Sequence, residues 1–289
     1  MIKTVFLNGE YMSEDKAKVS IFDRGFIFGD GVYEVVPVVE SIVLDKEPFL
    51  QRFERSLGEM ELEWPMSKEE FLVMIDEIIK RNEIKEGGVY MQVTRGVAPR
   101  DFAYPKDITP TVMAFGFKKE ILNSPLAKSG IKVVTVDDIR WKRRDIKSIA
   151  LLGQCMAKEQ AAKKGAYEGW MVEDGFVTEG TSSTAYIVKD GKIITRPLSN
   201  SILSGIRRKL LIEIAKEHGV ELEQRFFSVT EALEADEAFL SSATTFVLPI
   251  IEIDGKQIGD GKPGPITKKM RQMYIDSALK IAGITVGHL

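Results

Sequence analysis

The segment Ser204-Gly205-Ile206-Arg207 has the residue types of a phosphate-binding site. A loop rich in Asn and Ser, residues 199–204, leads into it, and a helical pattern begins near Gly205. Free N–H groups at the start of a helix, together with the helix dipole, can cradle a phosphate. A serine that merely caps the helix would leave the same pattern, and the sequence alone favours this simpler interpretation. Position by itself therefore leaves both alternatives open.

Few residues are available for histidine or cysteine chemistry. Cys155 is the only cysteine, which excludes an intrachain disulfide and argues against a cysteine-based zinc site. The two histidines are His218 and His288, the latter next to last. His218 stands before Gly219 at the end of a helical pattern, where a cationic side chain complements the helix dipole. We therefore expect neither a Ser-His-Asp hydrolase nor a metal site.

The common nucleotide-binding patterns are missing from the chain. Residues 25–31, Gly-Phe-Ile-Phe-Gly-Asp-Gly, do not fit G-x-G-x-x-G, because Glu34 follows where a third glycine is needed. The strand pattern also follows these glycines rather than preceding them. No G-x-x-x-x-G-K-[ST] loop occurs either. The sequence therefore predicts neither a Rossmann nor a P-loop protein.

The composition is that of an ordinary globular protein. Of 289 residues, 44% are hydrophobic and 29% charged, and the formal net charge is -3, which argues against a nucleic-acid partner. No apolar run approaches the ~18 residues of a membrane helix. Residues 1–6 lack the apolar core and cleavage site of a signal peptide. We expect a cytoplasmic protein with no membrane or nucleic-acid partner.

Local patterns predict a mixture of strands and helices in the first half. Residues 6–12 predict a hairpin around Asn8-Gly9. Strand patterns cover residues 32–39, 42–44, 89–94 and 111–117. Helical patterns cover residues 49–62 and 68–82, and the second is opened by the capping box Ser67…Glu70.

The second half carries three Asp-Gly turns between apolar runs, at Asp174-Gly175, Asp190-Gly191 and Asp254-Gly255. Each is a hairpin signal, and together they predict a curved, mostly antiparallel sheet. Helical patterns cover residues 148–164, 205–218 and 265–282. A polar break at residues 118–128 indicates a linker. We predict a two-domain protein, α/β to α+β: a small N-terminal domain (1–120), a linker (121–133) and a larger C-terminal domain (134–289).

Several segments together resemble the fold-type IV pyridoxal-phosphate (PLP) enzymes, and most of all the D-amino acid aminotransferases. They occur in the family's order and span nearly the whole chain. The segments are Asp23-Arg24-Gly25 with residues 28–35, residues 92–96 with Pro99-Arg100, residues 138–141, 145–153, 177–183 and 202–206, and residues 249–255. The resemblance implies a PLP-dependent transaminase of D-alanine, D-glutamate or D-aspartate, with 2-oxoglutarate or pyruvate as acceptor.

The resemblance assigns the central chemistry to a lysine and a carboxylate. Lys147 would form the Schiff base with PLP and, once displaced, shuttle a proton at the substrate Cα. Glu179 would pair with the pyridine nitrogen and keep it protonated, so that the ring accepts electrons. Arg140 resembles a family arginine near this carboxylate. Without the resemblance, Lys147 is one basic residue among 40 Lys and Arg, and a solvated lysine at a helix start is the better interpretation.

The resemblance also supplies the groups that hold the cofactor phosphate and ring. Arg52 matches the family's phosphate arginine, a role suited to guanidinium. Gly205, Ile206 and Arg207 would offer the N–H groups of a helix start, and Leu203 would pack against the pyridine ring. The family usually places a hydroxyl on the phosphate where this chain has Ala243. Thr244 or a backbone N–H would take that contact here.

Substrate binding in this branch is implied to rest on Tyr33 and Arg100, which hold the α-carboxylate. Relatives supply the arginine from the partner subunit, so a homodimer with a shared active site is implied. They also commonly carry a histidine two positions after that arginine, where this chain has Phe102. A lost charge-assisted hydrogen bond is worth ~1.5–3 kcal/mol. We expect weaker carboxylate binding, or a substitute donor such as Arg143 or Arg144.

Two alternatives lie within the same fold. Branched-chain L-amino acid aminotransferases tend to have Phe-Glu-Gly where this chain has Tyr33-Glu34-Val35. They also have an arginine in the run where this chain has Thr181-Ser182-Ser183-Thr184. Aminodeoxychorismate lyase would share Lys147 and Glu179 but eliminate pyruvate instead of transferring an amine. The lyase is the alternative from another reaction class.

Overall fold

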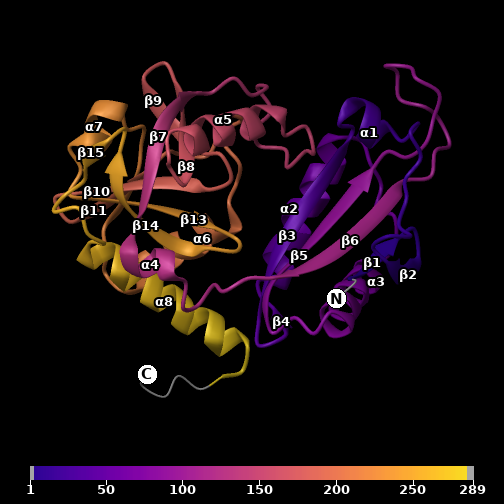
Figure 1. Ribbon diagram of the computed structural model, residues 1–289, viewed down its shortest axis with the longest axis horizontal. Helices are drawn as coiled ribbons and strands as arrows, with labels where there is room; N and C mark the ends of the chain where they lie inside the picture. The colour runs from indigo at the N-terminus through magenta and orange to yellow at the C-terminus, as the bar shows by residue number, and fades with distance from the viewer. Residues whose placement is uncertain (1–2, 285–289) are drawn as a thin grey trace. The chain divides into compact units, whose positions relative to one another are not determined.

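The computed structural model describes residues 3–284, which fall into two compact units (Figure 1). Unit 1 comprises the chain up to Glu120 together with residues 146–151. Unit 2 comprises residues 121–145 and the chain from Leu152 onward. His288 lies outside the described residues. Within those residues, no helix is long and apolar enough to cross a membrane.

Unit 1 is built on an antiparallel six-stranded sheet in the order β2-β1-β6-β5-β3-β4. The strands are β1 (Thr4–Leu7), β2 (Glu10–Ser13), β3 (Gly31–Val39), β4 (Ile42–Val43), β5 (Glu86–Thr94) and β6 (Thr111–Lys118). β1 and β2 form the hairpin predicted around Asn8-Gly9, and both turn residues have positive φ. The long central strands β3 and β5 pair over their full length.

Three helices complete unit 1: α1 (Arg24–Phe28), α2 (Lys46–Glu59) and α3 (Lys68–Arg81). α2 packs on β3 and α3 packs on β1, β5 and β6, each through its apolar stripe. The capping box predicted at Ser67 and Glu70 is present, with both of its reciprocal hydrogen bonds. This local signal is confirmed because it depends only on residues three positions apart.

Unit 2 is built on a larger, curled mixed sheet, ordered β12-β11-β10-β13-β14-β7-β8-β9, with β15 beside β14. The strands are β7 (Ile131–Asp137), β8 (Glu168–Glu173), β9 (Phe176–Gly180), β10 (Thr184–Lys189), β11 (Lys192–Thr195), β12 (Leu222–Gln224), β13 (Glu237–Ser242), β14 (Phe246–Ile253) and β15 (Lys256–Gln257). β7 pairs in parallel with β8 and β14, and β11 with β12; the other described pairs are antiparallel. The predicted fold class, with a mostly antiparallel sheet, is confirmed.

The helices of unit 2 cover this sheet. They are α4 (Pro125–Ser129), α5 (Leu152–Lys163), α6 (Ile206–Glu217), α7 (Val229–Leu233) and α8 (Pro265–Ile281). Strand alternation sends Val134 and Val136 of β7 toward α5, while Val133 joins the core on the opposite face. His218 is the C-cap of α6, with Nδ1 3.0 Å from the carbonyl oxygen of Ile214. It therefore has the helix-end position that the sequence predicted.

Each Asp-Gly dipeptide lies in a hairpin turn, between β8 and β9, β10 and β11, and β14 and β15. Both residues of each turn have positive φ, the conformation that makes these dipeptides such specific signals.

Two boundaries differ from the sequence prediction. Residues 121–133 contain α4 and the start of β7, and they belong to unit 2 rather than forming a separate linker. The helix expected from Ser148 begins only at Leu152, because residues 146–151 belong to unit 1, where Ser148 forms a β-bridge with Val32 of β3. The helical periodicity of this segment is overridden by backbone pairing with a strand more than one hundred residues away.

Candidate active site

The segment that carries Lys147 is fixed by backbone pairing along β3. The N–H of Tyr33 donates to the carbonyl of Lys147, and the N–H of Ile149 donates to the carbonyl of Gly31, both at 3.0 Å. A side chain at Gly31 would place its Cβ 2.6 Å from the carbonyl oxygen of Val93, closer than real Cβ atoms come. Gly31 therefore has no room for a side chain between β5 and Ile149, whose Cδ1 would lie 3.0 Å from that Cβ. The hydrogen bonds of Tyr33 and Ile149 hold the backbone around Lys147.

The side chain of Lys147 lies against an aromatic wall. Its Nζ is 4.1 Å from the centroid of the Tyr33 ring, a cation–π distance. The Tyr33 ring stacks on Tyr90 at 5.4 Å, and Tyr90 stacks on Phe115 at 4.9 Å. Burial raises the pKa of Tyr90 and keeps its hydroxyl a neutral donor to Gln92 at 2.8 Å. The structure therefore brings Lys147 and Tyr33 together and holds Tyr33 in place.

Arg52 of α2 is oriented by a carboxylate that the sequence analysis missed. Its Nε and Nη2 donate to the two oxygens of Glu34, each at 2.7 Å, and Glu34 is fully buried. A two-point ion pair of this kind fixes the plane of the guanidinium. Alternation along β3 could have revealed it, because Glu34 and Tyr33 must point to opposite faces and a buried Glu needs a cation.

Arg100 lies in the loop between β5 and β6 and is exposed. Its guanidinium carbon is 5.2 Å from the ring of Phe102 and 5.6 Å from the ring of Phe28. Phe102 itself is 76% exposed, so this aromatic residue stands on the surface where a donor was expected.

In unit 2, Glu179 is brought together with two other predicted residues, Arg140 and Leu203. Glu179 lies near the end of β9 and is only 5% exposed. Its Oε1 accepts from Arg140 Nη1 at 2.5 Å, and the Leu203 N–H donates to both carboxylate oxygens at 3.1 and 3.3 Å. Burial raises the pKa of Glu179, while Arg140 and the Leu203 N–H act in the opposite direction.

Arg140 is itself held by Asp138, a residue to which the sequence analysis gave no role. Asp138 accepts from Arg140 at 2.7 and 2.9 Å and from the Thr178 hydroxyl at 2.7 Å, and it forms an ion pair with Arg144 at 3.2 Å. Arg144 also binds both oxygens of Glu173 at 2.9 Å. Burial opposes ionisation of Asp138, but Arg140, Thr178 and Arg144 together lower its pKa.

We call the line Glu179, Arg140, Asp138, Arg144 and Glu173 the Asp138 network. Its charges alternate in sign, and its side chains other than Glu173 are almost completely buried. Arg144 is therefore not a substitute donor for a substrate carboxylate, because both ends of its guanidinium are engaged with acids. Arg143, the other residue considered, pairs with Asp145 at 3.1 Å.

The start of α6 answers the question that the sequence left open. The N-cap is Gly205 rather than Ser204, and no side chain caps the helix. A Cβ at Gly205 would lie 2.9 Å from the Thr184 hydroxyl, so the position has no room for one. Ile206 and Arg207 follow in the first turn, and the Arg207 guanidinium donates to the Tyr274 hydroxyl. The plain Ser cap is wrong, and the geometry favours the backbone cradle.

Thr244 lies in the connection between β13 and β14 and is half-buried. The neighbouring hydroxyls of Ser242 and Thr245 are 2.7 Å apart and satisfy one another. The assignment of Thr244 to the phosphate stays a prediction.

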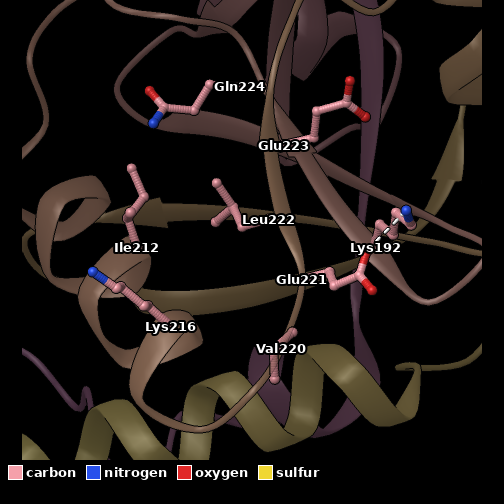
Figure 2. A pocket seen from close by; sticks show the side chains of 8 residues that line it. All are labelled: Lys192, Ile212, Lys216, Val220, Glu221, Leu222, Glu223 and Gln224. Carbon is pink, nitrogen blue, oxygen red and sulfur yellow. Dashed lines mark ion pairs between the residues drawn. The ribbon is translucent and has the colours of Figure 1, made fainter.

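A surface pocket of unit 2 is not this site (Figure 2). It lies between α6 and β12 and is lined by Lys192, Ile212, Lys216, Val220, Glu221, Leu222, Glu223 and Gln224. Lys192 and Glu221 form an ion pair at its edge, 2.8 Å apart. None of the residues predicted to do chemistry lines this pocket.

Comparison with curated proteins gives relatives over almost the full length. The chain is 41% identical to a D-alanine aminotransferase of Staphylococcus haemolyticus over 277 residues, which cover 94% of this chain and 98% of that protein. It is 38% identical to a D-alanine aminotransferase of Bacillus licheniformis over 282 residues, covering 98% and 99% of the two chains.

Solved structures with the same fold include branched-chain aminotransferases. The enzyme from Escherichia coli superimposes with a TM-score of 0.86 at 24% identity and covers 96% of this chain and 94% of that one. The enzyme from Thermoproteus uzoniensis, solved with norvaline, gives 0.86 at 26% identity, covering 97% and 96%. A third, from T.th., was solved with pyridoxamine 5'-phosphate and gives 0.90 at 23% identity, covering 96% and 94%. At 23–26% sequence identity, the structural similarity to these three enzymes shows the fold alone.

A match to a family model agrees with the curated relatives and with the solved structures. The profile of amino-transferase class IV matches residues 31–253, which include Lys147, Glu179 and the start of α6. The chain belongs to the class IV aminotransferases.

Proposed function

We propose that this protein transfers the amino group of D-amino acids, of the D-alanine, D-glutamate and D-aspartate type, to 2-oxo acids such as 2-oxoglutarate or pyruvate, using pyridoxal 5'-phosphate. The observation that carries the proposal is a sequence identity of 40–41% to D-alanine aminotransferases over nearly the whole chain. The placement of Lys147 against Tyr33 supports it, because these are the residues assigned to the amine and to the substrate carboxylate.

The residues present fit this cofactor. Gly205 has no room for a Cβ, and the first turn of α6, from Ile206 and Arg207, carries no side-chain cap, as a phosphate cradle requires. Arg52, oriented by Glu34, would add the charge-assisted contact to phosphate.

The pyridine ring would be held by the residues of unit 2. Glu179, buried and steadied by Arg140, would meet the ring nitrogen, and Leu203 would pack on the ring. Thr244 is the proposed hydroxyl contact to the phosphate.

The chain's own residues supply proton transfer and electrostatics. When bound, pyridoxal phosphate would accept the amino group and stabilise negative charge at the substrate Cα. The Lys147 amine would carry the proton to and from that carbon. Glu179 would hold a proton at the ring nitrogen, and Arg140, bound to the carboxylate, opposes the rise in the pKa of Glu179 that burial causes. Tyr33 and Arg100 would orient the substrate through its α-carboxylate.

The two other reactions considered have less support. The branched-chain reaction rests on solved structures of low identity, which speak for the fold. The run where those enzymes carry an arginine has a separate role here, since the side chains of Thr181, Ser182 and Ser183 all donate to the buried carboxylate of Glu168. The lyase reaction has no observation of its own in its favour.

The decisive experiment follows the absorption of the protein loaded with pyridoxal phosphate. D-alanine should convert the cofactor to its amino form with release of pyruvate, and L-alanine should not. Bleaching by L-branched amino acids alone would move the assignment to the branched-chain enzymes, and an unperturbed band with pyruvate released from aminodeoxychorismate would indicate the lyase.

Lys147→Ala tests the proposed amine. Transamination should fall by about 10²- to 10⁴-fold, the usual contribution of a positioned acid–base group. Lys142→Ala is the matched control, because Lys142 is an exposed lysine five residues earlier. Full activity of Lys147→Ala, or equal loss in both variants, would remove Lys147 from its role.

A homodimer with a shared active site is the remaining part of the proposal. Exposed apolar side chains in unit 1, Ile21, Phe22, Phe26 and Val97, support an interface on that unit. Co-refolding Lys147→Ala with Arg100→Ala should restore activity, since the mixed dimer then contains one site with both residues intact. No recovery, with mixed dimers present, would place Arg100 in the site of its own chain.

A further inference from the structure

The loop between β5 and β6, residues 95–110, carries Arg100 on the surface, yet its backbone is anchored from below. Gly96 has φ of +104°, and a Cβ there would lie 2.0 Å from the carbonyl oxygen of Thr109. The two ends of the loop therefore close on one another. The N–H of Arg24 also donates to the carbonyl of Gly96 at 2.8 Å, which joins the loop to the start of α1.

Arg24 then reaches past this base to the middle of the loop. Its guanidinium, 3% exposed, donates to three consecutive backbone carbonyls, those of residues 101–103, at 2.5, 3.5 and 3.4 Å. Its Nε donates to Asp30 at 2.7 Å. A buried guanidinium engaged in this way fixes the loop directly after Arg100, because three carbonyls and one carboxylate must be satisfied by one rigid group.

Asp30 holds a second arginine through the same oxygen. Arg95 Nε donates to Asp30 at 2.8 Å, and its Nη groups donate to the carbonyls of Met60 and Glu61, at the end of α2. Its guanidinium carbon also lies 3.5 Å from the ring centroid of Tyr104. We call Arg24, Asp30 and Arg95 the Asp30 cluster. Among the described residues, the Arg95 guanidinium thus donates to Asp30 and the end of α2 rather than to residues 101–103.

The ring of Phe28 links this cluster to Arg100. Arg24 lies 4.8 Å and Arg100 lies 5.6 Å from its centroid, and Phe102 packs against it at 5.6 Å. A ring contact of this kind favours particular guanidinium positions. The arginine proposed to bind the substrate carboxylate is therefore steadied through its backbone by Arg24 and through its side chain by Phe28 and Phe102.

We propose that Arg24 is a positioning residue for substrate recognition: it fixes the backbone after Arg100, so that the Arg100 guanidinium is held ready for the substrate α-carboxylate. The proposal rests on the function proposed above and adds the element that organises its carboxylate site. Arg24 is too buried to meet the substrate in this arrangement, so its effect must pass through the loop.

The test is Arg24→Lys in the cofactor-loaded protein, with Arg95→Lys as matched control. Lysine keeps the charge next to Asp30 but cannot serve three carbonyls at once. We expect the KM for D-alanine and the inhibition constant of propionate, a carboxylate without an amine, each to rise about tenfold in Arg24→Lys, with kcat within twofold. In Arg95→Lys, which loses a buried guanidinium from the same cluster, both constants should change less than threefold.

Chymotryptic cleavage measures the loop without reference to activity. Phe102 is an exposed cleavage site, and cleavage after it should accelerate in Arg24→Lys. An unchanged rate would overturn the anchoring itself. Faster cleavage with unchanged KM and inhibition constant would overturn the link to recognition, as would equal changes of KM and kcat in both lysine variants.

Arg100→Lys separates failure of this inference from failure of the proposed function. An unchanged KM in Arg100→Lys would remove Arg100 from carboxylate binding, whatever Arg24 does. A raised KM in Arg100→Lys with no change in Arg24→Lys would overturn the inference alone. If Arg24→Lys does not fold, Phe28→Leu tests the same arrangement, and an unchanged KM there would overturn it.

Discussion

Each unit of this protein contains an aspartate between two arginines, and the two arrangements end differently. In unit 1, Asp30 binds Arg24 and Arg95, which go on to backbone carbonyls of two loops. In unit 2, Asp138 binds Arg140 and Arg144, which go on to the carboxylates of Glu179 and Glu173. The same three-residue pattern therefore fixes loops in one unit and a functional charge in the other.

The formal charges of the two groups differ in sign. In the Asp30 cluster, two guanidiniums against one carboxylate leave +1. In the Asp138 network, two guanidiniums against three carboxylates leave -1. Excess positive charge beneath Arg100 suits a loop that receives an anionic substrate, whereas excess negative charge around Glu179 suits pairing with a protonated ring nitrogen. Because all of these side chains except Glu173 are buried, the charges are weakly screened.

The largest expected effect is on stability. Asp138→Asn should lower the free energy of unfolding by about 3–5 kcal/mol, because removing one member of a buried ion pair leaves its partners uncompensated. Asp137→Asn, at the exposed neighbouring position, should change it by less than about 0.5 kcal/mol. Denaturant titration of the two variants measures both, and equal values would mean that the Asp138 network contributes no special stability.

This stability difference should depend on pH. The pKa of Asp138 is lowered in the folded protein, so its contribution is complete above the ordinary aspartate pKa of about 3.9 and is lost as the pH falls through the lowered value. The gap between wild type and Asp138→Asn should therefore narrow in acid. A gap that stays constant to the lowest pH at which the protein folds would contradict the role of ionised Asp138.

The next effect is on catalysis, and it separates the two ends of the Asp138 network. Glu179→Gln should lower kcat by about 100-fold, the scale of losing one preorganised electrostatic group, while the cofactor stays bound. Glu173→Gln, at the more exposed end, should lower kcat less than threefold. Steady-state kinetics with D-alanine and the cofactor absorption band test both. Similar losses in the two variants would show that the network acts as a whole rather than through Glu179.

The smallest effect concerns the loop that the positively charged Asp30 cluster anchors. Phe102→His would place a donor beside Arg100, and one additional charge-assisted bond should lower the KM for D-alanine about tenfold. Phe102→Leu removes the ring without adding a donor and should not lower the KM. If the two variants behave alike, residue 102 does not line the carboxylate site.

The sequence predicted those parts of the fold that depend on neighbours along the chain. Asn8-Gly9, the Asp-Gly turns and the Ser67–Glu70 capping box are specific because each needs particular φ values or side chains within a few residues. Where an apolar pattern spanned a whole element, as in β3 or α3, the bounds were predicted to within a few residues. The family resemblance then assigned Lys147 and Glu179.

The long-range partners could not be predicted in the same way. Two ion pairs, Glu34 with Arg52 and Asp138 with Arg144, form only because distant elements bury these side chains against one another. The sequence near Asp30 has no feature that points to Arg95, 65 positions later. The late start of α5 has a similar origin, because the competing backbone bonds come from β3.

The insertion of residues 146–151 into unit 1 has a consequence for the order of folding during synthesis. Unit 1 cannot complete the pairing of β3 until these residues have left the ribosome, long after residue 120 has done so. In the interval, the N–H of Tyr33 and the carbonyl of Gly31 lack their final partners, and the edge of β3 stays open to other strands. A nascent chain or a fragment that stops at residue 120 should therefore need a chaperone to escape aggregation, even though all six strands of the unit 1 sheet are already encoded in it.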